Sequence, residues 1–186
     1  MNRQKNLFSR EEMYLMNVEK LHERGVSIEQ IAEIAFKQQS KWKPDISYNE
    51  CLESVEKILS LRDVFHLLQL GAEIDRLTEA QAFHGPIQSI LETDLGMFGI
   101  DELFGLELAG LYGTIGKTNF GDIDVNKPGI VSKLNDAGKK PKGPCHTFLD
   151  DIVGAIAAAA STRVAQIENE LEARKDPSIV EQPKLF

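Results

Sequence analysis

The spacing of apolar residues along the first 82 positions predicts a series of amphipathic helices. Apolar side chains recur every three or four residues from Ser9 to Arg24, from Ile28 to about Gln39, after Ser47, and from about Arg62 to Ala82. Two of these segments open with a capping box, Ser27 with Gln30 and Ser47 with Glu50, in which each residue satisfies a backbone N–H group of the other. We therefore expect residues 1–82 to form the N-terminal part of a helical bundle with short connections.

The second half of the chain becomes rich in glycine after Phe83–Pro86. A short helix is predicted from Ile87 to Thr93, and a second apolar helix begins at Asp101. Glycines then interrupt the pattern, and the apolar residues between them are too scattered to build a sheet. We expect an all-α, multi-helix bundle in a single domain, in which residues 83–174 pack together with residues 1–82. Gly-rich loops are expected around a carboxylate cluster, and residues 175–186 are expected to form a flexible tail.

A long helix that begins near Thr147 is the most distinctive element of the sequence. Its body, Ile152–Ala160, consists of small and apolar residues that let neighbouring helices approach closely. Thr147 is placed to cap this helix, with Asp150 as its capping-box partner three residues later. The adjacent Asp150 and Asp151 also favour the dipole at this end of the helix. Capping alone is one interpretation of Asp150, and a chemical role is the other.

Composition narrows the classes of partner and compartment. With 21 Lys and Arg against 29 Asp and Glu, the net charge is −8, which argues against a nucleic-acid surface and leaves at most peripheral membrane contact. Cys51 and Cys145 are too few for a disulfide framework and fit a reducing compartment. The longest apolar run is about half of the roughly 20 residues that a bilayer span requires, and no signal peptide is evident. We expect a soluble, cytoplasmic protein, and exposed helix faces leave a homo-oligomer open.

Three partial motifs do not support the chemistry that they suggest. Gly116-Lys117-Thr118 ends like a phosphate-binding P-loop, but leucine stands at position 111, where the motif requires glycine. Asp122–Asn126 resembles the aspartyl-nucleophile signature of haloacid-dehalogenase phosphatases, although no apolar strand precedes it. Cys145 lacks the arginine six positions later that cysteine phosphatases use. Neither a His-Glu-x-x-His sequence nor a cysteine pair with zinc spacing is present.

Paired carboxylates are the remaining candidates for chemistry. They are Asp101 with Glu102, Asp122 with Asp124, and Asp150 with Asp151. Like charges at the edge of a core repel strongly, and a hard divalent cation relieves this repulsion, so the pairs favour Mg²⁺, Mn²⁺ or another divalent cation. Two of the pairs begin helices, whose N-termini attract anions, so a phosphate is expected to face the metal there. Lys127 could add a positive charge toward the same phosphate.

Several separate motifs occur together in a fixed order. They are Asp101-Glu102-x-x-Gly105, Tyr112–Gly116, Thr118–Gly121, Asp124-x-x-Lys127-Pro128, Lys127–Ile130 and His146–Ala155. On these motifs the chain resembles the phosphatidylglycerophosphatase A family, in particular its soluble YutG-like branch, from about Gly25 to Arg163. The resemblance implies an all-helical fold and a magnesium-dependent hydrolase that releases phosphate from phosphatidylglycerophosphate.

The resemblance also implies a set of site residues. Metal ligands are implied at Asp101, Glu102, Asp124, Asp150 and Asp151, while Asp122 has no counterpart. The implied catalytic residues are Asp150 or Glu102, to orient or deprotonate water, and Lys127, to stabilise charge on the transferring phosphoryl group. His146 is a further candidate for protonating the leaving oxygen.

The chain differs from the membrane-bound members of that family. It lacks their spanning helices and their tryptophan-rich version of the Lys127-Pro128 segment, and it carries an additional N-terminal bundle. The predicted substrate is therefore phosphatidylglycerophosphate or a related soluble phosphomonoester. The alternative is a non-catalytic metal-binding protein, with a regulatory or interaction role, that keeps the site without turnover.

Overall fold

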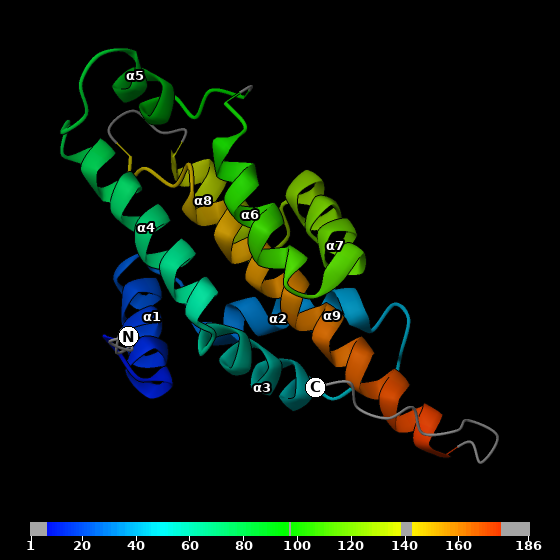
Figure 1. Ribbon diagram of the computed structural model, residues 1–186. Coiled ribbons are helices and arrows are strands. Elements are labelled where there is room, and N and C mark those ends of the chain that lie inside the picture. The colour runs from blue at the N-terminus through cyan, green and yellow to red at the C-terminus, as the bar shows by residue number, and fades with distance from the viewer. Residues whose placement is uncertain (1–6, 97, 139–142, 176–186) are drawn as a thin grey trace.

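The protein is described here by a computed structural model that covers residues 7–96, 98–138 and 143–175. Within these residues the chain is all-α, as predicted, and contains no strand. Nine helices follow one another in this part of the chain (Figure 1): α1 (Arg10–Glu23), α2 (Ile28–Gln39), α3 (Tyr48–Leu59), α4 (Arg62–Glu79), α5 (Pro86–Glu92), α6 (Ile100–Gly110), α7 (Gly113–Asn126), α8 (Ile130–Gly138) and α9 (Leu149–Lys175). The tail predicted at 175–186 lies outside the described residues except for Lys175.

Helix α9 is the central element around which the other helices pack. It contacts α2, α3 and α4 from the first half of the chain, and α6, α7 and α8 from the second (Figure 1). The segment Ile152–Ala160 is buried along its whole length because small side chains allow the surrounding backbones to come close. Residues 1–82 and 83–174 therefore contribute to one core within the described chain.

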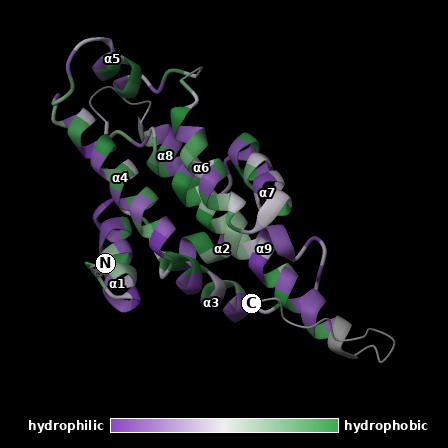
Figure 2. Ribbon diagram, in the orientation of Figure 1, coloured by the Kyte–Doolittle hydropathy of each residue, from purple (hydrophilic) through white to green (hydrophobic). Residues whose placement is uncertain are grey.

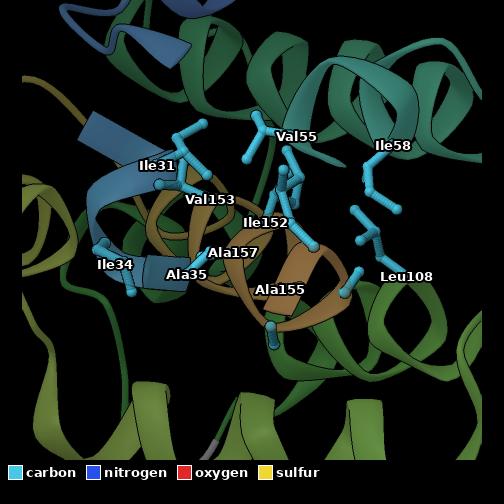
Figure 3. Packing of buried hydrophobic residues seen from close by; sticks show 14 of the residues in the cluster. Ile31, Ile34, Ala35, Val55, Ile58, Leu108, Ile152, Val153, Ala155 and Ala157 are labelled. Atoms are coloured by element: carbon cyan, nitrogen blue, oxygen red, sulfur yellow. The ribbon is translucent and has the colours of Figure 1, made fainter. Parts of the chain in front are cut away.

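The core is formed where the apolar faces of several helices meet α9. Figure 3 shows Ile31 and Ile34 of α2, Val55 and Ile58 of α3, and Leu108 of α6 gathered around Ile152, Val153, Ala155 and Ala157. The apolar positions predicted for α2 and α3 form this buried face. In Figure 2, the outer helices α1 and α4 alternate between hydrophilic and hydrophobic residues, whereas α6 is mostly hydrophobic.

The two predicted capping boxes are confirmed. The Ser27 hydroxyl accepts from the N–H of Gln30, and the Gln30 side chain accepts from the N–H of Ser27. Ser47 and Glu50 are likewise joined in a capping box at the start of α3. These reciprocal bonds satisfy N–H groups that have no partner inside the helix, which is why both helices begin where the sequence indicated.

The apolar helix predicted to begin at Asp101 is α6, but the expectation of Gly-rich loops after it was wrong for most of residues 113–138, which form α7 and α8. Glycine serves here in close helix packing. A Cβ atom on Gly105 would lie 2.3 Å from Cζ of Phe120, and one on Gly116 would lie 2.1 Å from the carbonyl oxygen of Ala109. The absence of side chains therefore lets α6 and α7 approach each other more closely than larger residues would permit.

Among the described residues, not one helix combines the length and the apolar character needed to cross a bilayer.

Candidate functional site

Lys127 joins three of the predicted acidic residues. It caps the C-terminus of α7 in the left-handed backbone conformation, with φ of 40°. Its Nζ atom lies 2.6 Å from Oδ1 of Asp124, 3.2 Å from Oδ2 of Asp150 and 3.3 Å from Oδ1 of Asp151. The end of α7 and the start of α9 are thereby linked by one ammonium group, whose three N–H bonds match three carboxylates.

The two aspartates on α9 are the most buried members of this cluster. The side chains of Asp150 and Asp151 are 7% and 4% exposed, against 27% for Lys127. Burial, followed by the charge of Asp150, raises the pKa of Asp151 to about 9 despite the opposing charge of Lys127. Burial likewise raises the pKa of Asp150 to about 6. Burial of Lys127 lowers its pKa, but the three aspartates outweigh this and leave the pKa above its ordinary value.

Asp101 on the first turn of α6 is the fourth member of the cluster. It is 7% exposed, and its Oδ1 atom is buried without a hydrogen-bond partner. Burial and the charge of Glu102 raise the pKa of Asp101 to about 6. The charge of Asp101 in turn contributes to the raised pKa of Asp151, and α6 packs against α9.

Glu102 and Asp122 are less closely connected to the cluster. Oε2 of Glu102 lies near Gly99 at the start of α6, and the bonds described for Lys127 do not include it. The side chain of Asp122 is 48% exposed, accepts from Asn126 at 2.9 Å and lies 3.9 Å from Lys41. The pair Asp122 and Asp124 is thus divided, and only Asp124 reaches the cluster.

The predicted cap of α9 by Thr147 was wrong. The two carboxylate oxygens of Asp75 on α4 accept from the N–H groups of Phe148 and Leu149, at 3.1 and 3.0 Å. The Thr147 hydroxyl instead donates to the carbonyl oxygen of Leu91 at 2.8 Å. Oδ1 of Asp150 accepts from the N–H of Asp151 at 3.0 Å, so Asp150 does not serve as a capping-box partner of Thr147.

This arrangement also corrects the expectation that the N-terminus of α9 faces a phosphate. Its first free N–H groups are taken by Asp75, and the next two by the carbonyl of His146 and by the Asp150 side chain. The backbone N–H groups of residues 148–151 are therefore already bonded within the protein and do not offer a phosphate site.

Asp75 is the main residue that sequence reasoning missed. It is fully buried, and burial raises its pKa to about 8 against the opposing effect of its two N–H donors. One signal was present in the sequence, since Asp75 continues the buried spacing of Val64, Leu68 and Gly71 along α4. Asp94, in the turn after α5, was also missed, and its charge contributes to the raised pKa of Asp150.

His146 lies just before α9 and is 7% exposed. Its Nδ1 atom is 3.4 Å from the guanidinium of Arg24. Burial and the charge of Arg24 lower the pKa of His146 to about 4. The imidazole is therefore neutral near pH 7, which disfavours its suggested role as a proton donor.

The chemistry of the cluster fits a hard divalent cation. Asp101, Asp124, Asp150 and Asp151 supply only oxygen donors, the last three face one ammonium group, and one oxygen of Asp101 has no partner. Across the described residues, no three His, Cys, Asp or Glu side chains are already arranged to hold a metal ion. Lys127 lies between three of the carboxylates and partly balances their charge.

Comparison with known proteins agrees with the motifs. The chain matches the family description of phosphatidylglycerophosphatase A over residues 30–166. It is 46% identical over 146 residues to the uncharacterized protein YutG of Bacillus subtilis, covering 78% of this chain and 86% of that protein. The crystal structure of ypjQ from Bacillus subtilis superposes with a TM-score of 0.82 at 41% identity, over 88% of this chain and 99% of the other. The low temperature requirement C protein from Listeria monocytogenes superposes with a TM-score of 0.80 at 40% identity, over 84% and 97% of the two chains.

The sequence match covers the helices that supply the carboxylates and Lys127, as well as Asp75. It begins within α2 and continues into α9, so most of the described fold lies inside it. The chain therefore belongs to the phosphatidylglycerophosphatase A family.

Proposed function

We propose that the protein is a divalent-metal-dependent phosphomonoester hydrolase whose site is the carboxylate cluster around Lys127. The observation that carries this proposal is the convergence of Asp124, Asp150 and Asp151 from two helices on the ammonium group of Lys127, together with the buried Asp101 of a third helix, whose charge raises the pKa of Asp151. Such a concentration of acidic groups is costly to a fold, and function is the common reason for it.

Mg²⁺ or Mn²⁺ suits these oxygen ligands, and when bound it polarises a phosphoryl oxygen and lowers the pKa of a coordinated water. The residues that would hold it are the predicted ligands, Asp101, Glu102, Asp124, Asp150 and Asp151. Glu102 is included because it is next to Asp101 on the first turn of α6, although it makes no bond to Lys127 in the described structure.

The chain's own residues supply the remaining functions. Lys127 places a positive charge at the cluster, where it can neutralise charge on the transferring phosphoryl group. Asp150 is proposed as the base that orients or deprotonates water, since its carboxylate lies at the cluster, 3.2 Å from Nζ of Lys127. Glu102 is the second candidate for this role.

The proposed substrate is phosphatidylglycerophosphate or a related soluble phosphomonoester. The family supports the lipid phosphate, whereas the net charge of −8 opposes prolonged contact with an anionic bilayer. A panel that contains both kinds of phosphomonoester, the lipid in neutral detergent micelles and soluble esters in buffer, distinguishes these substrates.

The test combines Mg²⁺ binding by calorimetry with phosphate release from this panel. We expect the wild type to bind Mg²⁺ and release phosphate, and Asp151→Asn to lose both. Asp122→Asn is the matched control, because it neutralises a nearby aspartate that lies outside the cluster. If Asp151→Asn retains binding and turnover, the proposal is wrong. If the wild type binds Mg²⁺ without releasing phosphate from any substrate, the non-catalytic alternative is supported.

A further inference from the structure

One face of α4 holds the start of α9. Gly71, Asp75 and Glu79 are spaced four residues apart, so they lie on the same side of the helix. We call these three residues the α4 anchor face. Each of them contacts the chain between Cys145 and Ile152, immediately around Asp150 and Asp151.

Asp75 and Gly71 determine how closely the first turn of α9 lies against α4. The carboxylate of Asp75 spans two successive N–H groups, those of Phe148 and Leu149. One turn earlier on α4, a Cβ atom on Gly71 would lie 2.4 Å from Cδ1 of Ile152. Helices α4 and α9 therefore pack in one register. Hydrogen bonds fix the residues just before Asp150, and close apolar contact fixes Ile152 just after it.

Glu79 continues this attachment upstream of α9. Its Oε1 atom accepts from the N–H of Cys145 at 2.8 Å. Arg24 binds both carboxylate oxygens of Glu79, at 3.1 and 2.7 Å, and also donates to the carbonyl oxygen of Cys145. The segment that leads into α9 is thus held by side chains from α4 and from the end of α1.

Capping alone does not explain why a buried carboxylate is used. Thr147 offers a local hydroxyl of the kind that usually caps a helix, yet this hydroxyl donates to Leu91 instead. A remote carboxylate on α4 adds a constraint that a local cap lacks, since it ties the rotation of the first turn to another helix. The next two residues after this attachment are Asp150 and Asp151, which both bond to Lys127.

We propose that Asp75, assisted by Glu79, is a positioning residue that sets where the carboxylates of Asp150 and Asp151 lie relative to Lys127. The inference rests on the proposed function of the cluster, because a displaced carboxylate matters to catalysis only if the cluster is catalytic. Displacement of a catalytic group by about 1 Å can lower turnover about 100-fold.

The test uses Asp75→Asn, which preserves size but replaces one acceptor by a donor. The matched control is Ser54→Ala, because the buried Ser54 hydroxyl donates to the carbonyl of Ala160 at 2.9 Å, on α9 but far from its first turn. Both variants lose a buried contact to the same helix. We measure kcat and KM with a soluble phosphomonoester, and amide hydrogen exchange along α9.

We expect Asp75→Asn to lower kcat by about 10- to 100-fold with little change in KM, and to accelerate exchange selectively at residues 150–153. Ser54→Ala should retain kcat and leave exchange in this first turn unchanged. Wild-type kcat in Asp75→Asn, or an equal loss in both variants, overturns the positioning role.

Two further measurements keep the outcome decisive. If Asp75→Asn does not fold, Glu79→Gln tests the same attachment at a position that is 30% exposed. A smaller loss of kcat is then expected, and wild-type kcat contradicts the proposal. If the wild type shows no turnover, the proposed function fails by itself. Hydrogen exchange then still tests whether Asp75 holds the first turn of α9 against α4. Unchanged exchange at residues 150–153 in Asp75→Asn then rejects it.

Discussion

Replacement of Lys127 by methionine tests the electrostatics of the cluster directly. Methionine keeps an unbranched side chain of similar length and removes the charge that Asp124, Asp150 and Asp151 share. The distances from Nζ to these carboxylates are 2.6, 3.2 and 3.3 Å. The substitution therefore leaves acidic groups in a buried region without their cation.

The expected cost follows from the burial of the partners. The side chains of Asp150 and Asp151 are 7% and 4% exposed, and removing one partner of a buried ion pair costs about 3–5 kcal/mol. Asp124 is 28% exposed and contributes less, on the order of 0.5 kcal/mol. We expect Lys127→Met to lower the free energy of unfolding by about 3–5 kcal/mol at pH 7.5 without metal.

Urea denaturation followed by circular dichroism, in the presence of a chelator, measures this loss. A change of about 4 kcal/mol moves the midpoint by about 2 M when the slope is about 2 kcal/mol/M. The matched control is Lys37→Met, whose Nζ lies 2.7 Å from Oε1 of Glu33 with both side chains more than half exposed. That pair should contribute only about 0.3–0.5 kcal/mol.

The stability difference between wild type and Lys127→Met at acidic pH provides a second check. Because the pKa of Asp151 is about 9, that carboxyl is already largely protonated at pH 7.5, and acidification through the pKa of Asp150, about 6, removes the remaining buried charge that Lys127 balances. The difference between wild type and Lys127→Met should therefore shrink as the pH falls below about 5. If Lys127→Met costs no more than Lys37→Met at pH 7.5, the cluster does not depend on this ammonium group and the reasoning is refuted.

Two other predictions follow from packing and from titration. Gly105→Ala should lower the free energy of unfolding by about 1–3 kcal/mol, because its Cβ would lie 2.3 Å from Cζ of Phe120. Combination with Phe120→Leu should cost less than the sum of the two single changes in urea denaturation, and simple additivity would contradict a direct clash. For pH, burial raises the pKa values of Asp101 and Asp150 to about 6, above their ordinary values near 4 in the unfolded chain. The folded state then binds more protons than the unfolded state between about pH 4 and 6, so the stability from these groups is present below pH 4 and is lost as the pH rises through 6. Without metal, the free energy of unfolding of Asp101→Asn should fall less with rising pH than that of the wild type. Identical pH profiles for the two proteins would contradict the raised pKa of Asp101.

The parts of this fold that depend on residues close in sequence were predictable. The capping boxes of α2 and α3 join residues three positions apart, and the apolar faces of both helices repeat within two turns. The positions of Asp101, Asp124, Asp150 and Asp151 in the motif order were visible in the sequence, but only the structure shows that Lys127 joins three of them, Asp124, Asp150 and Asp151.

The glycines of α7 show why local helix propensity led to the wrong prediction of a loop. In isolation, the glycines of α7 disfavour a helix, and a loop was the natural expectation. The helix forms because α6 and α7 pack closely at Gly105 and Gly116, so tertiary contact outweighs the local cost. That contact involves residues on different helices and leaves no mark in the periodicity of either one.

The wrong prediction for the cap of α9 is also explained by a tertiary contact, here between residues far apart in sequence. Thr147 satisfied the local rule, but Asp75 lies 73 and 74 positions from the N–H groups that it binds. A capping box is selected by chain geometry within one turn, whereas this bond exists only once α4 and α9 have packed against each other. Local helix formation is therefore readable from residue order, and the placement of buried charge depends on which helices the core brings together.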